Sequence, residues 1–336
     1  MSTSFLEGVL AQPENLRDAA AGMRDALDAA DLAPLRTGTI VLSGIGASWH
    51  ALLPATRALR LAGRRAFAVP APELPGTRDL ADAYVLISQS GASTELLAAR
   101  ESLEDRPVYV LSARGNSPLV AGAEHWLPLS RRPDTPVSTL SYTATLQALG
   151  MLCGAIAAHG DDAAGAIDWS AVADLAAESL DRHQEAAELL AAQLASSRTL
   201  DAVAAAPALA SAGETSLLAR EGLHLPADAL ETRQYLHGPL ESAGEGFCCV
   251  LFGGARELEL AGSLAGYGAA TCVITDEDRP APFGAHAIRI AAVAELAAPI
   301  LQIVPLQLAV AKAAATLGLP VRELTRQQPD TKTAAA

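Results

Sequence analysis

Short apolar runs alternate with stretches of helical spacing in the first half of the chain. The apolar runs have the length of buried strands and lie at 39–44, 66–69, 84–87, 108–112 and 125–129. Stretches with helical composition or spacing cover 49–61, 94–103 and 140–158. Residues 4–33 also show helical spacing, which Gln12-Pro13 divides into two pieces. Strands that alternate with helices predict a parallel sheet with helices on both faces.

The second half of the chain repeats this outline. Its predicted strands lie at 199–203, 247–252, 270–274 and 287–290, and its predicted helices lie near 214–223, 257–260 and 299–317. A charged helical stretch, 161–197, separates the two halves. The predicted fold class is therefore α/β, with two doubly wound parallel sheets in tandem. We expect five parts: a helical segment at 1–33, a first α/β domain at 34–160, a connector at 161–197, a second α/β domain at 198–325 and a tail at 326–336.

Polar side chains directly follow the predicted strand at 84–87. The segment Ser88-Gln-Ser-Gly-Ala-Ser93 leads into the helix that begins near Thr94. A buried strand that passes through a short polar turn into a helix presents free backbone N–H groups to an anion, and Gly91 lets the main chain approach a ligand closely. The serines could instead merely cap the helix. Three serines and a glutamine within six positions exceed what a cap requires, so the segment favours a phosphate or another small anion.

A second turn of small residues, Ile45-Gly-Ala-Ser48, follows the strand at 39–44. In parallel sheets, ligands bind at the carboxyl edge near the switch in strand order. We therefore expect Ser48 and the segment from Ser88 to Ser93 to lie at the same edge. The corresponding loop of the second half is Gly253-Gly-Ala-Arg256, which lacks the serines, so only one half is expected to bind the anion.

Another set of candidate residues occurs in the second half. His237 precedes Gly238-Pro239, which predicts a turn, and Glu221 lies sixteen residues upstream in a helical pattern. A carboxylate and an imidazole supply the two groups of acid–base catalysis near neutral pH. Taken alone, a solvated glutamate and a surface histidine are the simpler interpretation. Lys332 lies in a tail whose composition is typical of disorder.

Composition and charge narrow the possible functions. The chain has 336 residues, half of them hydrophobic, and a formal net charge of −14. This charge argues against nucleic-acid binding, although a helix N-terminus can still bind a small anion. We expect no signal peptide and no membrane span, because the apolar stretches are interrupted by polar residues. Four cysteines without metal-ligand spacing indicate buried thiols, no disulfides and a cytoplasmic location, and no metal or organic cofactor is expected.

Taken together, these motifs resemble the sugar isomerase (SIS) domain family. The resemblance is greatest to the tandem pair in the isomerase half of glutamine–fructose-6-phosphate transaminase, and it extends to stand-alone amino-sugar-phosphate deaminases and isomerases. It runs from about residue 34 to the C-terminus. The matching motifs are Gly46-Ala-Ser48, Ile87-Ser-Gln-Ser-Gly91 and His237-Gly-Pro239, with Glu221 at the family's spacing and Lys332 near the family's C-terminal lysine.

The resemblance implies a role for each matching residue. Ser88, Gln89, Ser90 and Ser93 would hold the substrate phosphate, and Ser48 would contact the sugar. Glu221 would move a proton between C1 and C2, and His237, reaching the site from the partner subunit of a homodimer, would assist ring opening. Lys332 would form an iminium with the ketose carbonyl or otherwise polarise it. A 1,2-proton shift needs one base, an opened ring and stabilisation of the neighbouring charge.

The sequence also departs from the family's pattern. Ala92 stands where the family often has a glutamate, and Ala47 stands where it has a threonine. Leu140 takes the place of a lysine, and Leu236 that of a basic residue. The tail reads Gln328-Pro-Asp-Thr-Lys332. These changes leave the identity of the sugar open. The chain begins at the isomerase helix and its first residues lack a cysteine nucleophile, so the resemblance implies no glutamine-dependent synthesis by this chain alone.

Two classes of function follow. The first is an isomerase and deaminase that acts on an amino-sugar 6-phosphate, and a deglycase that cleaves a phosphorylated ketosamine would use the same residues. The second is a non-catalytic sugar-phosphate sensor, which needs only the serine loop. Glu221, His237 and Lys332 favour the enzyme. A catalytic partner of a separate glutaminase chain is a third possibility.

Overall fold

The computed structural model describes residues 4–77, 79–103, 105–157, 167–321, 324, 326 and 328–333. The chain divides into two compact units, each assembled from three stretches. The first-sheet unit comprises Glu14–Arg132, Leu140–Ser170 and Thr325–Ala336. The second-sheet unit comprises Met1–Pro13, Pro133–Thr139 and Ala171–Leu324.

The first-sheet unit contains a parallel sheet of five strands. They are β1 (Ile40–Gly44), β2 (Ala66–Ala68), β3 (Ala83–Ile87), β4 (Val108–Ser112) and β5 (His125–Pro128), in the order β2-β1-β3-β4-β5. Every residue of β1 and β3 is buried, as expected for central strands of a sheet covered on both faces. The register pairs Gly44 with Ile87, so β1 and β3 end at the same edge.

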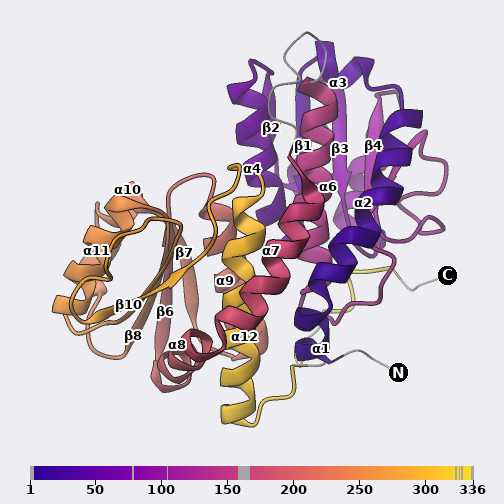
Figure 1. Ribbon diagram of the computed structural model, residues 1–336. Coiled ribbons are helices and arrows are strands. Elements are labelled where there is room, and N and C mark those ends of the chain that lie inside the picture. Colours follow the sequence, from indigo (N-terminus) through magenta and orange to yellow (C-terminus); the bar gives the residue numbers. More distant parts are fainter. Residues whose placement is uncertain are drawn as a thin grey trace. The chain divides into compact units, whose positions relative to one another are not determined.

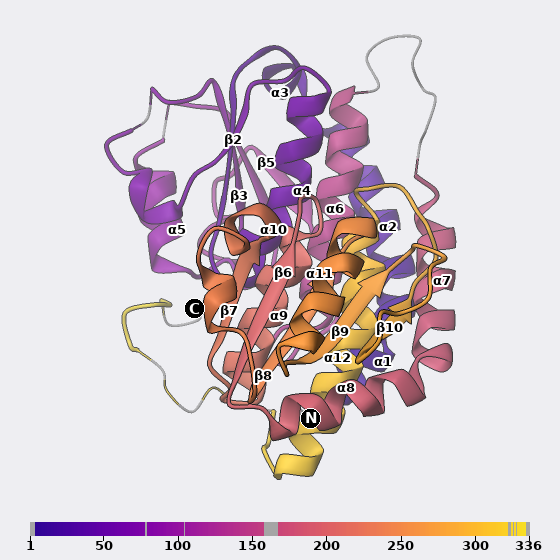
Figure 2. The ribbon, with the colours of Figure 1, turned by 90° about the vertical axis from the view of Figure 1, so that its left-hand side faces the viewer.

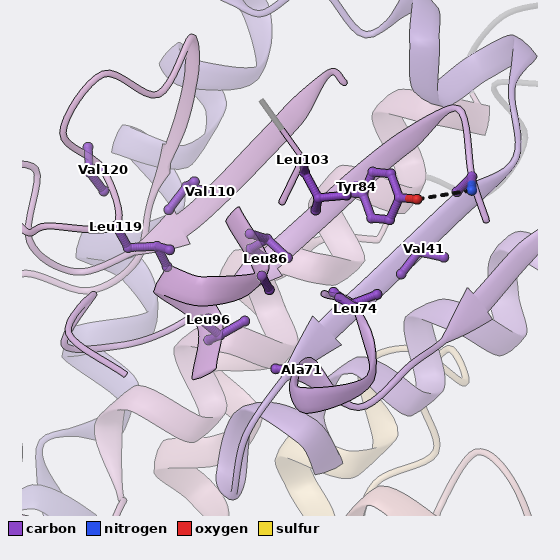
Figure 3. Packing of buried hydrophobic residues seen from close by; sticks show 12 residues of the cluster. Val41, Ala71, Leu74, Tyr84, Leu86, Leu96, Leu103, Val110, Leu119 and Val120 are labelled. Carbon is purple, nitrogen blue, oxygen red and sulfur yellow. Dashed lines mark hydrogen bonds between the residues drawn. The ribbon is translucent and has the colours of Figure 1, made fainter. Parts of the chain in front are cut away.

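Helices cover both faces of this sheet. They are α2 (Gln12–Ala29), α3 (Ala33–Thr37), α4 (Ala47–Leu61), the 3₁₀ helix η1 (Ala71–Glu73), α5 (Thr94–Glu101) and α6 (Leu140–Ala157). On one face, Leu96 of α5 packs with Leu86 and Val110 in a buried cluster (Figure 3), and Tyr84 accepts a hydrogen bond there from the Ala81 N–H (3.1 Å). On the other face α4 lies on β1 and packs against α6, so α5 and α6 lie on opposite sides of the sheet (Figure 2).

The second-sheet unit has the same strand order. Its parallel strands are β6 (Thr199–Ala204), β7 (Ala227–Glu231), β8 (Phe247–Phe252), β9 (Ala270–Thr275) and β10 (Ala285–Arg289), arranged β10-β9-β8-β6-β7. In both sheets the first strand lies between the second and the third, and the fourth and fifth follow outward. This arrangement confirms the predicted fold class, with two doubly wound parallel sheets. The short edge strand β7 was not predicted.

The helices of this unit also lie on both faces of their sheet. They are α1 (Phe5–Leu10), α7 (Trp169–Arg182), α8 (Gln184–Ser196), α9 (Leu209–Gly222), α10 (Thr232–Tyr235), the 3₁₀ helix η2 (Pro239–Ser242), α11 (Ala255–Gly266) and α12 (Ala298–Leu317). One face carries α10 and α11, and the other carries α9, against which α12 packs (Figure 1). Helices α7 and α8 lie within 161–197, the stretch predicted to be helical, and residues 161–166 of that stretch lie outside the described residues.

Two helices, α6 and α12, are long and apolar enough to cross a membrane by length and composition. However, 78% of the apolar window of α6 and 72% of that of α12 are buried inside the protein. Both therefore have the burial of core helices.

The four cysteines are free and buried, and burial raises the pKa of the Cys153 thiol to about 12. The interpretation of Cys248-Cys249 as buried thiols is thus confirmed.

Candidate functional site

The loop from Ser88 to Ser93, hereafter the serine loop, joins the buried strand β3 to α5 at the carboxyl edge of the first sheet. Gly91 has φ +63°, and a Cβ on it would overlap the side chain of Ser117. Only glycine fits this position without strain. Strong local signals, namely an apolar strand, a glycine and a helix start, therefore place the loop where the sequence predicted it.

Hydroxyl groups line the serine loop. The Oγ atoms of Ser88 and Ser93 lie 3.3 Å apart, and Ser88 Oγ accepts a hydrogen bond from the Gly91 N–H (3.1 Å). Ser88 is buried, whereas Gln89, Ser90 and Ser93 are half-buried. Ser93 occupies the N-cap position of α5, but its side chain makes no capping hydrogen bond. The serines do not simply cap the helix, so hydroxyls and first-turn N–H groups lie together at this helix start.

Ser48 lies next to the same edge, on the neighbouring strand's turn. It is the second residue of α4, directly after β1, and it is half-buried. Gly46 forms the turn with φ +59°, and no side chain caps α4. Strand β1 lies between β2 and β3, so the strand order reverses at β1 and β3. Ser48 follows β1 and the serine loop follows β3, so the two lie on either side of this switch point. Ligands bind at such switch points.

The C-terminal tail lies against the serine loop. Lys332 forms an isolated antiparallel bridge with Ser93, the Thr333 N–H donates to the Ala92 carbonyl (3.0 Å), and the Thr94 hydroxyl donates to the Asp330 carbonyl (2.6 Å). The side chain of Lys332 is exposed. The chain has two lysines, and the other, Lys312, is paired with Glu188 at 2.9 Å. The tail thus brings Lys332, for which the described residues supply no ion-pair partner, next to the predicted phosphate site.

Glu221 and His237 both belong to the second-sheet unit. Glu221 is the penultimate residue of α9 and is half-buried. His237 lies between α10 and η2 and is exposed. The turn predicted for Gly238-Pro239 is present, with Gly238 at φ +148° and Pro239 opening the 3₁₀ helix. The histidine is therefore held on a loop, as its sequence context indicated.

Glu214 is a candidate that the sequence analysis missed. It lies on α9 two turns before Glu221, on the same side of the helix, and it is fully buried. Neither carboxyl oxygen has a hydrogen-bond partner among the described residues. Burial raises the pKa of Glu214 well above its usual value, and the charges of Glu221 and Asp134 raise it further. A spacing of seven residues from Glu221 was the available signal, but burial depends on packing that no local pattern reveals.

The equivalent loop of the second sheet differs in its chemistry. After β8, the N–H of Gly254 donates to Oε2 of Glu257 (3.2 Å) at the start of α11, and the Thr232 hydroxyl donates to Oε1 (2.7 Å). A protein carboxylate thus occupies this helix start, where the first sheet has hydroxyls. Among the described residues, no three His, Cys, Asp or Glu side chains gather in a way that could hold a metal ion.

Comparison with curated proteins finds one relative over most of the chain. The chain is 28% identical over 330 residues to glutamine–fructose-6-phosphate aminotransferase (isomerizing) of Pyrobaculum aerophilum, covering 90% of this chain and 53% of that protein. The chain therefore spans about half the length of this curated relative. No family model matches the chain.

Solved structures share the fold. The chain has a TM-score of 0.77 with tagatose-6-phosphate ketose/aldose isomerase of Escherichia coli, at 18% identity and 97% coverage of both chains. It has a TM-score of 0.71 with glucosamine-6-phosphate deaminase of Thermotoga maritima, at 18% identity, covering 94% of this chain and 97% of that one. At these identities the likeness establishes the fold alone, because one fold supports several reactions.

Proposed function

We propose that the protein is a phosphosugar isomerase and deaminase of the sugar isomerase (SIS) family that acts on an amino-sugar 6-phosphate. The single observation that carries the proposal is the main-chain bridge between Lys332 and Ser93, which brings the residue with the exposed amine beside a hydroxyl-lined helix start. The hydroxyls and N–H groups of the serine loop suit a phosphate. The sequence similarity to glutamine–fructose-6-phosphate aminotransferase of Pyrobaculum aerophilum supports the same substrate class.

The proposed reaction begins when His237 assists opening of the sugar ring. Glu221 then takes the proton from C2 of the open-chain 2-amino aldose and returns it to C1, which converts the aldehyde into a hydroxymethyl group and the amine into an imine. Water hydrolyses the imine to the ketose phosphate and ammonia. Lys332 polarises the ketose carbonyl at C2, or displaces ammonia from the C2 imine to form an iminium that water then hydrolyses to the ketose and the free lysine. Ser48 contacts the sugar. General acid–base steps of this kind contribute rate factors of about 10²–10⁴ each.

We further propose a cytoplasmic homodimer in which His237 serves the partner subunit. The exposure of His237 on a loop supports this assignment, because the side chain is accessible to a second chain. Residues 34–160 and 198–325 are proposed as the two family domains. A deglycase reaction on phosphorylated ketosamines would use the same groups and differ only in the leaving amine.

The proposal is tested by measuring release of ammonia or amine from a panel of amino-sugar 6-phosphates and phosphorylated ketosamines. Release from a member of the panel identifies the reaction and separates deaminase from deglycase. A panel without release, in which a sugar phosphate still raises the melting temperature, would support a sensor instead. Absence of both release and stabilisation would contradict the assignment of the substrate class.

A further inference from the structure

The loop that follows β4, residues 113–120, holds the serine loop in place. The carbonyl of Gln89 accepts hydrogen bonds from the Ala113 N–H (3.2 Å) and the Ser112 hydroxyl (3.4 Å). The carbonyl of Gly91 accepts one from the Leu119 N–H (2.9 Å). These three donors fix the carbonyls of Gln89 and Gly91. The backbone of the serine loop is therefore tied to the strand and loop beside it.

The supporting loop is itself fixed at both ends. Nη1 of Arg100 donates to the carbonyls of Leu119 (2.5 Å) and Ala121 (2.7 Å). At the other end the Trp126 indole donates to the Ser112 carbonyl (3.0 Å), and its ring packs so closely on Gly115 that a Cβ there would overlap it. The exposed tip between these anchors therefore has a fixed backbone beside the serine loop.

Arg114 lies on this tip and is exposed. Its N–H donates to Ser112 Oγ (3.3 Å) and its carbonyl accepts from the Ser117 N–H (3.2 Å), so both of its hydrogen bonds are made by the main chain. Among the described residues, no carboxylate pairs with its guanidinium. By contrast, Arg106 and Arg132 of the same unit are paired with carboxylates. Arg114 thus has no counter-ion among the described residues. It lies two positions after Ser112, whose hydroxyl donates to the Gln89 carbonyl of the serine loop.

Ser117 gives an independent sign of an incomplete site at the same place. Its side chain is only 4% exposed and lies against Gly91, and its Oγ has no hydrogen-bond partner in the described part of the chain. Buried hydroxyls are nearly always hydrogen-bonded in folded proteins. The Ser117 hydroxyl lies next to Gly91 of the serine loop. Its lack of a partner is explained if a ligand that binds the serine loop brings a polar group within reach of this hydroxyl.

We propose that Arg114 is the cation of the phosphate site, whose guanidinium binds the dianionic phosphate of the ligand together with the serine loop. This assignment rests on the proposed function, because it takes the serine loop as the phosphate site. The serine loop contains no charged side chain, and the chain carries a net charge of −14 that repels an anion. A guanidinium makes charge-assisted hydrogen bonds to phosphate oxygens. Arg114 would thus favour the dianion, which forms above a phosphate pKa of about 6.

The experiment measures the affinity for glucosamine 6-phosphate and for inorganic phosphate by calorimetry at low and high salt, and all proteins titrated with the sugar phosphate also carry Glu221→Gln so that the ligand is not consumed. Arg114→Ala should weaken binding of both roughly tenfold at low salt, and the loss should shrink at high salt. Arg114→Lys should restore most of the affinity. Arg65→Ala is the matched control, because Arg65 is exposed and directly precedes β2, at the opposite edge of the same sheet. Arg65→Ala should bind both ligands with the affinity of the protein that keeps Arg65.

The pH dependence separates a ligand contact from a structural effect. Affinity of the unchanged protein should rise from pH 5 to pH 7 as the phosphate loses its second proton, and Arg114→Ala should flatten this rise. Equal affinities of Arg114→Ala and the unchanged protein, while Ser90→Ala binds weakly, would overturn the assignment of Arg114 alone. Absence of phosphate binding by the unchanged protein would overturn the proposed function and the assignment with it.

Discussion

Lys332 pairs with Ser93 through an isolated antiparallel bridge, which brings the C-terminal tail to the start of α5. The bridge joins residues 239 positions apart in the sequence. The hydrogen bonds that hold this stretch use main-chain groups of residues 330, 331 and 333 and the hydroxyl of Thr333. None of these bonds uses the side chain of Lys332, which is exposed.

Replacement of this amine should stop turnover without releasing the tail. Lys332→Met should lower amine release roughly a hundredfold or more, because the carbonyl loses its charged partner, while sugar-phosphate affinity changes little. Lys312→Met is the control: it removes the other lysine, which pairs with Glu188 on the surface, and should leave the rate unchanged. Full activity of Lys332→Met would remove Lys332 from the reaction.

Ser90 of the serine loop should contribute to the affinity for a phosphorylated sugar and not to the affinity for the same sugar without its phosphate. Ser90→Ala removes a half-buried hydroxyl and should weaken binding of a sugar phosphate by about five- to twentyfold, with no effect on the dephosphorylated sugar. Ser102→Ala, at the opposite end of α5, is the matched control. Titration calorimetry with both sugars measures the difference. Equal weakening for both sugars would indicate that Ser90 contacts another part of the ligand.

The buried carboxyl of Glu214 should make stability depend on pH. Its pKa is raised in the folded state, so the folded protein binds a proton that the unfolded chain has lost above its ordinary pKa. The free energy of unfolding should therefore decrease as the pH rises from about 4.5 toward the folded-state pKa. Glu214→Gln lacks this titration. Its free energy of unfolding, compared with that of the unchanged protein, should therefore be more favourable at pH 8 than at pH 5.

Thermal unfolding of both proteins across this pH range measures the effect. Each 1 kcal/mol in the free energy of unfolding moves the melting temperature by roughly 2–4 °C or less in a chain of this size. Taking the difference between the two proteins cancels the titration of groups that do not interact with Glu214, and leaves that of Glu214 and of its neighbours Glu221 and Asp134. Parallel curves for the unchanged protein and Glu214→Gln would show that Glu214 keeps an ordinary pKa in the folded state.

The proposed homodimer predicts complementation between inactive variants. Subunits with Glu221→Gln and subunits with His237→Ala should each be inactive, and mixing them should restore part of the activity, because some sites then combine both intact residues. Refolded or co-expressed mixtures with verified mixed dimers provide the measurement. No recovery in such dimers would show that one chain supplies both residues to its own site.

The sequence predicted those features that depend on local patterns. The strand β3, the turn at Gly91 and the helix α5 follow from an apolar run, a glycine and helix-forming residues next to one another. The edge strand β7 was missed because its sequence, Ala227-Asp-Ala-Leu-Glu231, lacks β-branched residues and is only partly buried. Its place in the sheet depends on pairing with β6, which no local signal indicates.

Features that depend on distant contacts could not be read from the sequence. The contact of Gly8 with Thr139 places α1 in the second-sheet unit, although α1 precedes the first strand. The composition of the tail is typical of disorder, yet Thr333 and Lys332 lie against the serine loop. The burial of Glu214 likewise follows from packing around α9. In each case the deciding partner is more than a hundred positions away or belongs to another element.

The central claim is that Glu221 transfers the proton in a reaction on a sugar phosphate. It is tested most directly by measuring ammonia release and ligand affinity for the unchanged protein and for Glu221→Gln with the same amino-sugar 6-phosphate. Glu221→Gln should lower the rate of release by roughly a thousandfold and leave the affinity within a few-fold. Ammonia release by Glu221→Gln at the rate of the unchanged protein would show that Glu221 does not transfer the proton.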